Sequence, residues 1–267
     1  MIEAILKYTF MQNAVIAGIL ASIVCGIIGT VIVEKRLVSM SGGIAHASFG
    51  GIGLGYLIGI EPILGGLAFA LGASLSIPAL NRNTSANSDT LIGIFWSAGM
   101  AFGILFISLM PGYPPDMTSY LFGDILTVSR VYLYIMAFMT IVLIAIFASM
   151  FSHWQAYLFD EEFTNIIGVN THYLERILYG MIALSIVVLI KVVGIILVIA
   201  LLTIPSASAK LFSIDLKKVI LGSIFFGMVY SLVGLYISYR FNIASGASII
   251  LFAAGSYLLM SIVKSFR

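Results

Sequence analysis

Long apolar stretches without a charged residue are the feature that most constrains this chain. The first of them runs from Phe10 to Val33 without a Lys, Arg, Asp or Glu, and comparable blocks recur to the C-terminus. A helix needs about 20 mostly apolar residues to cross a bilayer, and this first block is too long for the core of a signal peptide. The blocks do not alternate apolar and polar residues as membrane-barrel strands do. The sequence therefore predicts an all-α, polytopic membrane protein.

The composition supports this class and excludes others. Charged residues make up 9% of the chain and hydrophobic residues 61%, whereas roughly 25% of the residues in a soluble domain are charged. The net charge of +2 is spread without a basic run, so we expect no nucleic-acid partner. At about 20 residues each, eight or nine spans leave no room for a soluble domain. We expect residues 1–267 to form a single transmembrane domain.

Charged and turn-forming residues divide the chain into nine apolar blocks. Their ranges are 11–33, 37–60, 63–80, 90–110, 131–151, 177–190, 192–209, 219–239 and 243–263. The two blocks between residues 177 and 209 are too short for two full crossings, and Lys191, Gly194 and Pro205 interrupt them. Two alternatives stay open: a pair of short tilted helices with Lys191 reaching an interface, or a re-entrant or broken element packed inside protein. We therefore predict eight or nine transmembrane helices.

The distribution of Lys and Arg predicts the orientation. With nine crossings and the N-terminus outside, only four basic residues lie outside, namely Lys7, Arg130, Lys191 and Arg240. The other basic residues are then cytoplasmic, as the positive-inside rule requires. They are Lys35, Arg36, Arg82, Arg176, Lys210, Lys217, Lys218, Lys264 and Arg267. If the region around Lys191 is re-entrant, the crossings number eight and the last helices are reversed.

Acidic residues are confined to the ends of the blocks and the segments between them. The 11 of them are Glu3, Glu34, Glu61, Asp89, Asp116, Asp124, Asp160, Glu161, Glu162, Glu175 and Asp215. A carrier coupled to protons or sodium commonly keeps a carboxylate at mid-membrane, and a hydrolase with an acidic pair needs two carboxylates together. The pattern argues against both classes.

His46 is the one imidazole inside a predicted span. Neutral imidazole binds zinc and related metals, and ionisable groups within membranes are functional by default. The alternative is a buried histidine that bonds a hydroxyl or a carbonyl group. Small residues recur every fourth position around it, at Gly43, Ala47, Gly51, Gly55 and Gly59, which predicts close packing of this helix against another. We take His46 as a candidate metal or translocation-path residue.

The segment 159–170 is predicted to be a short amphipathic helix on the cytoplasmic side. The first of the residues named below can cap the helix, and the second is an acid in its first turn. The next three are apolar and share a face, and the last is a glycine that can end the helix. These residues are Asp160, Glu161, Phe163, Ile166, Ile167 and Gly168. The segment holds three acids and no base, so it suits a protein groove better than lipid headgroups. The alternative is an ordinary capped loop helix.

Three stretches resemble the permease subunits of ABC importers for zinc, manganese and iron ions. Residues 40–51 are similar to the family's histidine segment, and residues 159–169 are similar to its coupling segment. That segment leads, as in the family, to residues 191–198 and 202–209. Residues 238–247 resemble the family's serine–glycine signature, and Asp89 begins a stretch similar to the start of its fourth span. The order of these stretches along the chain makes the resemblance specific.

The resemblance implies a homodimeric permease in the plasma membrane of a prokaryote. It also implies a pair of cytoplasmic ATPase subunits docked at residues 159–170, and an extracellular or periplasmic protein that delivers the ion. The chain itself would bind no cofactor, and the metal ion is cargo. Family members often have aspartate where this chain has Gly42 and Asn242. Asp89, Lys191 and Asn242 are further candidates for the path or its gate.

The leading hypothesis is an ATP-driven uptake permease for a divalent transition metal ion that works by alternating access. The chain has no phosphate-binding glycine loop ending in Gly-Lys-Ser/Thr, so a separate subunit would hydrolyse the ATP. The alternative is a stand-alone secondary carrier or channel for a small polar solute. A membrane-embedded enzyme is a third class, but we find no pairing of nucleophile and base.

Overall fold

The computed structural model describes residues 7–84, 87–112 and 118–266, and all regular elements within these ranges are helices. Seven of the helices are long and apolar enough to cross a membrane. They are α2 (Thr9–Glu34), α4 (Pro62–Asn83), α5 (Ser88–Ser108), α7 (Arg130–Ser149), α10 (Thr171–Val193), α12 (Leu216–Phe241) and α13 (Ser245–Ser265). The predicted all-α class is confirmed for the described residues.

Two further apolar helices fall outside this group of seven. Helix α3 (Val38–Ile58) has 21 residues, but its many glycines and serines make it less apolar. Helix α11 (Ile195–Lys210) has only 16 residues. The shorter elements are α6 (Thr118–Phe122), η1 (Ile125–Thr127), α8 (Phe151–Phe159) and α9 (Glu161–Ile166).

The chain forms two compact units that alternate along the sequence. The first unit comprises residues 1–35, 121–150 and 192–267, and the second comprises residues 36–120 and 151–191. The first thus holds α2, α7, α11, α12 and α13, and the second holds α3, α4, α5, α8, α9 and most of α10.

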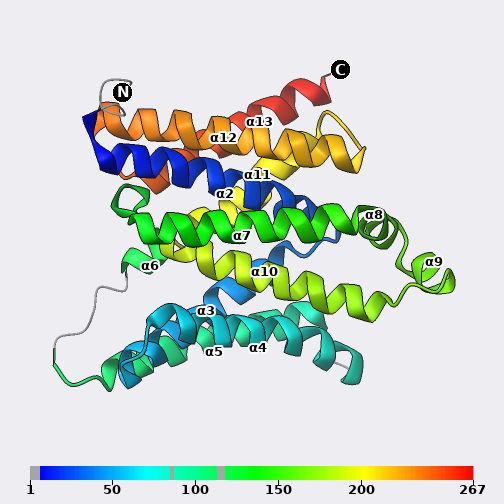
Figure 1. Cartoon of the computed structure of the whole chain (residues 1–267), viewed down its shortest axis with the longest axis horizontal. Coiled ribbons are helices and arrows are strands. Elements are labelled where there is room, and N and C mark those ends of the chain that lie inside the picture. Colours follow the sequence, from blue (N-terminus) through cyan, green and yellow to red (C-terminus); the bar gives the residue numbers. More distant parts are fainter. Residues whose placement is uncertain (1–6, 85–86, 113–117, 267) are drawn as a thin grey trace. The chain divides into compact units, whose positions relative to one another are not determined.

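In the first unit, α2 packs against α11 and α12, and α2 and α12 run side by side (Figure 1). Small residues permit this approach: a methyl group added to Gly29 would lie 2.1 Å from the carbonyl oxygen of Leu202. The Thr30 hydroxyl lies 3.1 Å from that of Ser223. Hydroxyl pairs of this kind join membrane helices whose apolar surfaces alone give little preference for protein over lipid.

Specific contacts hold each end of the first unit together. At one end, Lys210 Nζ donates to Glu34 Oε2 at 3.0 Å and connects α11 to α2. At the other end, Gly123 and Gly194 adopt positive φ angles of 65° and 78°. An added methyl group on Gly194 would lie 2.3 Å from the Gly123 nitrogen, so only glycine fits this backbone crossing.

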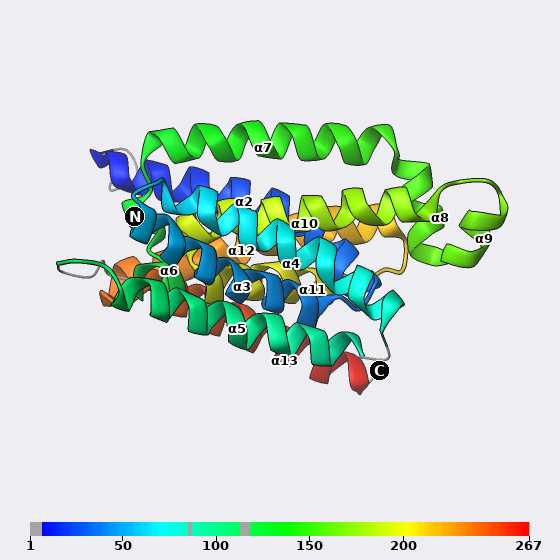
Figure 2. The ribbon, with the colours of Figure 1, turned by 90° about the horizontal axis from the view of Figure 1, so that it is seen from below.

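In the second unit, α3 packs between α4 and α5, and these three helices lie next to one another in Figure 2. The glycine ladder predicted for α3 forms these contacts as far as Gly55, whereas Gly59 lies beyond the helix as its C-cap, with a φ of 74°. A methyl group added to Gly51 would lie 2.0 Å from the carbonyl oxygen of Gly65 in α4. One on Gly99 of α5 would lie 2.4 Å from the Cα atom of Ala47. At one end of this unit, Arg82 pairs with Glu175 at 2.5 Å.

The structure contradicts one of the two alternatives for the region 177–209, a pair of short helices. Helix α10 has 23 residues because it begins at Thr171 and includes Glu175 in its first turns. A charged residue near a helix end does not stop the helix, although it does end an apolar block. Only α11 is short, and the break between the two helices lies at Gly194.

The acidic residues lie where the sequence predicts them, as far as the structure describes them. The described ones occupy helix ends, first turns or connections, and Glu3 and Asp116 lie outside the described residues. Within the described ranges, no carboxylate therefore lies at the middle of an apolar helix.

Candidate functional site

His46 lies on α3 where this helix faces α5. Its ring stacks on that of Trp96, with centroids 4.1 Å apart and planes 12° from parallel. The Nδ1 atom lies 3.4 Å from the Met100 sulfur, and the side chain is partly exposed. The site therefore offers one imidazole and one thioether, held against an indole ring.

Glycines set the geometry of this site. Ile92 of α5 packs on Gly43, where an added methyl group would meet its Cγ2 atom at 2.8 Å. Ile92, Trp96 and Met100 are four residues apart and so share one face of α5. Close backbone contact thus brings this face onto His46 and fixes the orientation of its ring.

These donors do not amount to a closed metal site within one chain. Among the described residues, no group of three or more His, Cys, Asp or Glu side chains is arranged to hold a metal ion. Structural zinc sites are usually four-coordinate, and catalytic zinc sites have three protein ligands. Here His46 is joined only by the weak sulfur donor of Met100.

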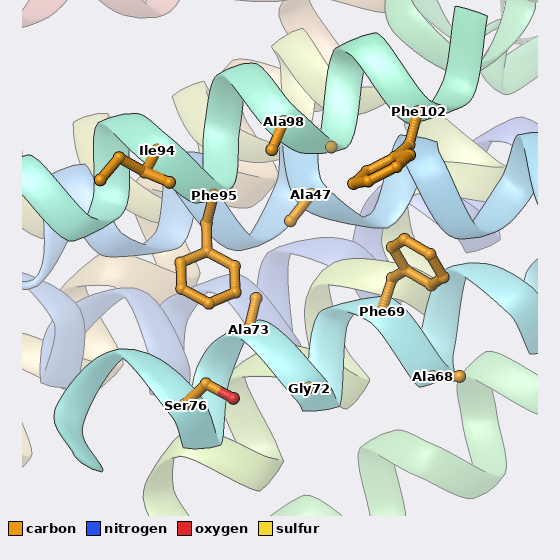
Figure 3. Close-up of a pocket in the computed structure, with 11 residues that line it drawn as sticks. Ala47, Ala68, Phe69, Gly72, Ala73, Ser76, Ile94, Phe95, Ala98 and Phe102 are labelled. Atoms are coloured by element: carbon orange, nitrogen blue, oxygen red, sulfur yellow. The ribbon is translucent and has the colours of Figure 1, made fainter. Parts of the chain in front are cut away.

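A separate apolar groove of about 370 Å³ lies among α3, α4 and α5. Figure 3 shows that Phe69 of α4 and Phe102 of α5 point toward one another across it, with Phe95 and Ala47 nearby. Its polar side chain is Ser76. A single hydroxyl among apolar side chains is a poor set of ligands for an ion.

The acidic segment 159–170 begins at the end of α8, and only Glu161–Ile166 of it form a helix, α9. The Asp160 carboxylate accepts a hydrogen bond from the Phe163 amide at 2.9 Å and caps α9. Glu161 lies in the first turn, and the helix ends where Gly168 adopts a φ of 88°. The cap satisfies one of the open amide groups at the helix start.

The segment is attached through α8 and exposes its apolar side chains. Trp154 and Tyr157 of α8 are buried, and burial raises the pKa of the Tyr157 hydroxyl. By contrast, the segment's large apolar side chains are uncovered. Their exposed fractions are 90% for Phe159, 56% for Phe163, 81% for Ile166 and 54% for Ile167. An exposed apolar face on an anchored helix is suited to a protein groove.

Lys191 lies at the end of the second unit away from Arg82, near the C-terminal end of α10. Its ammonium group donates to the Tyr120 hydroxyl at 3.1 Å and lies 4.9 Å from the centre of that ring. The Tyr120 hydroxyl in turn lies 3.1 Å from that of Tyr56. A hydrogen bond and a cation–π contact thus hold the charge.

Asp89 and Asn242 occupy helix ends. Asp89 is exposed in the first turn of α5, seven residues before Trp96, which is roughly 10 Å along the helix axis. Asn242 ends α12 with φ 54° and ψ 47°, a left-handed conformation that asparagine tolerates better than most residues. The structure does not bring Asn242 and His46 into one unit.

Sequence reasoning missed Trp96, Met100, Tyr56 and Tyr120 as partners of the candidate residues. A signal for the first two was present, since Ile92, Trp96 and Met100 repeat at helical spacing opposite a glycine ladder. The tyrosines are partners across 64 residues of sequence, which no local pattern indicates.

Comparison with known proteins gives a consistent result. The model of the ABC 3 transport family matches residues 7–264. An uncharacterized membrane protein of Synechocystis is 43% identical over 262 residues, which cover 97% of this chain and 93% of that protein. The manganese transport system membrane protein MntC of Listeria monocytogenes is 34% identical over 252 residues, covering 94% and 90%. The solved structure of PsaBC from Streptococcus pneumoniae in complex with Fab matches with a TM-score of 0.88 and 32% identity, covering 97% of this chain and 93% of that chain.

Proposed function

The chain belongs to the ABC 3 transport family, and on this basis we propose that it is the membrane permease of an ATP-driven importer for a divalent transition metal ion. The observation that carries this proposal is α9, a capped acidic helix with an uncovered apolar face, in a chain without a nucleotide-binding motif. A chain of this kind needs a partner that supplies energy, and α9 offers that partner a surface.

The proposed topology has nine crossings, with the N-terminus outside. The seven long apolar helices together with α3 and α11 make nine. Arg82 and Glu175 pair at the same end of the second unit as the start of α10, which follows α9. The first unit gathers Lys210 and Lys264 at one end, where Lys264 bonds the Leu211 carbonyl oxygen. Both basic ends are cytoplasmic in this scheme.

In the proposed mechanism, an ATPase subunit binds the apolar face of Phe163, Ile166 and Ile167. Its closure moves α8 and α9 together, because the buried Trp154 and Tyr157 anchor α8 in the second unit. The movement shifts the permease between inward-facing and outward-facing populations. An extracellular or periplasmic binding protein delivers the ion to the outward-facing form.

His46 is the proposed contact of the ion along its path. A homodimer would supply a second His46, which is the simplest way to add a donor to a site that one chain leaves open. The relative named for manganese transport makes manganese the first ion to test, with zinc and iron next. The stand-alone carrier loses support, because the chain's family is one of ABC transport proteins.

The coupling role is tested by placing a charge on the apolar face of α9. We expect Phe163→Glu and Ile167→Glu to abolish manganese uptake into cells, and to release the ATPase subunit during purification of the permease. The matched control is Ile214→Glu, which puts the same charge on a side chain that is 93% exposed in another connection. Normal uptake by both α9 variants would refute the coupling role.

The role of His46 is tested by His46→Ala. We expect lower uptake with normal expression and a normal complex with the ATPase. Met100→Leu separately tests the second donor, because it keeps the packing beside the ring and removes only the sulfur. Unchanged uptake in His46→Ala would assign this histidine to packing against Trp96.

A further inference from the structure

A groove of about 650 Å³ lies at the Lys210 end of the first unit. It is formed by the connection after α11 and the last turns of α13. Its lining residues are Leu211, Phe212, Leu259, Met260, Val263 and Lys264. The volume lies within the range of about 300–1,000 Å³ that is typical of pockets for small molecules.

The groove is held open by ordered contacts. The Phe212 ring stacks on that of Phe226 in α12, with centroids 5.9 Å apart. The Lys264 ammonium group donates to the carbonyl oxygen of Leu211, so the charge is fixed at the rim. An ammonium group has three donors, and this bond uses one of them.

One lysine, Lys264, lines the groove, and two more follow Phe212 closely in the sequence. Lys217 and Lys218 begin α12 a few residues after Phe212, and both side chains are exposed. Among the described residues, neither ammonium group forms an ion pair. The nearby carboxylate of Asp215 caps α12 by accepting a bond from the Lys218 amide at 3.0 Å. Lys217, Lys218 and Lys264 thus outnumber the one carboxylate of these segments, Asp215.

We propose that this groove binds an anionic glycerophospholipid, with an acyl chain along the apolar floor and the phosphate at Lys264, while Lys217 and Lys218 add positive charge from the start of α12. The ligand must be apolar at one end and negatively charged at the other, and such a lipid has both properties. Basic residues beside membrane helices at the cytoplasmic face select anionic headgroups. The inference does not depend on which ion the protein transports.

Charge also argues against a second copy of the chain as the occupant. In a two-fold dimer, the same surface of each copy forms the interface, so pairing of the two grooves would set Lys264 against its own copy. Like charges at close range oppose such a contact. A lipid phosphate instead neutralises the rim.

The test measures the fluorescence of the full chain with Phe212→Trp in phosphatidylcholine vesicles. One series contains a rising mole fraction of brominated phosphatidylglycerol, and a second contains a rising mole fraction of brominated phosphatidylcholine. The parent chain has two tryptophans, whose signal is subtracted. We expect brominated phosphatidylglycerol to quench the new tryptophan at a much lower mole fraction than brominated phosphatidylcholine does. Each ammonium group contributes about a fivefold preference. The preference should shrink at high salt, because salt screens charges at an exposed rim.

Two matched variants identify the cause. We expect Lys217→Gln with Lys218→Gln and Lys264→Gln to remove most of the preference. The control loses the same number of charges at other exposed positions, through Lys7→Gln, Arg130→Gln and Arg240→Gln, and should keep it. Equal quenching by the two lipids would overturn the proposal. So would an absence of quenching together with crosslinking between copies through Val263→Cys, since the groove would then be a protein interface.

Discussion

Replacing Gly51 by alanine tests whether backbone contact between α3 and α4 holds the helix that carries His46. The added methyl group would lie 2.0 Å from the Gly65 carbonyl oxygen, whereas ordinary contact begins at 3.4 Å. Both groups belong to helix backbones, so no side chain can rotate away. The helices must separate by roughly 1.4 Å, and overpacking of a tight interior costs about 1–3 kcal/mol.

The magnitude follows from comparison with Gly72→Ala on α4, where the structure has no atom within 4 Å of the added methyl group. Alanine stabilises a helix by about 1 kcal/mol relative to glycine, and both variants gain this term. The cost at Gly51 falls at the top of the overpacking range, about 3 kcal/mol, because the clash is deep and rigid. We therefore expect the two variants to differ by about 3 kcal/mol in unfolding free energy.

The assay is the apparent melting temperature of each purified variant in the same detergent. A difference of about 3 kcal/mol corresponds to roughly 6–12 °C for a chain of this size, with Gly51→Ala the less stable. Uptake should fall with it, since Gly51 lies little more than one turn beyond His46. Equal melting temperatures for the two variants would refute the packing argument.

Three further predictions concern polar groups at the ends of the units. In a double-mutant cycle, Glu34→Ala and Lys210→Ala should show a coupling energy of about 0.5–1 kcal/mol in unfolding, because this ion pair is only partly exposed; additive losses would contradict it. The Arg82–Glu175 pair has an Arg82 side chain that is 43% exposed. In the same kind of cycle its coupling energy should be below about 1 kcal/mol, and it should vanish in about 1 M salt. Burial raises the pKa of Tyr157, so the unfolded chain ionises first and stability should fall as the pH rises above about 10. Tyr157→Phe should flatten that alkaline slope in denaturation midpoints measured across this range, and an unchanged slope would contradict the assignment.

The sequence predicts the apolar helices well because membrane solvation acts on each segment separately. The first block, 11–33, corresponds to α2 at Thr9–Glu34. The largest boundary error concerns the block 177–190, where α10 runs from Thr171 to Val193. Charged residues at the aqueous end of a helix interrupt the apolar pattern without interrupting the backbone hydrogen bonds, so pattern alone shortens such a helix.

The α9 segment was also predictable, because capping is a local interaction. The Asp160 carboxylate and the Phe163 amide are three residues apart, and Gly168 can adopt the positive φ that ends the segment. The surroundings of His46 were not predictable in the same way. The ring of Trp96 is brought to it by the approach of Gly99 to Ala47, which depends on how two helices pack.

The donor set around His46 bears on where the importer selects its ion. Manganese prefers oxygen ligands, whereas imidazole and thioether suit softer metals. In the described residues, no three His, Cys, Asp or Glu side chains meet, and Asp89 lies two turns along α5 from Trp96. A manganese ion passing His46 would therefore keep most of its water. Weak binding favours release along a path, so discrimination among divalent ions would fall to the delivering protein. The purified permease alone should then show no high-affinity manganese binding in calorimetry, and a tight site there would show that selection occurs within the membrane.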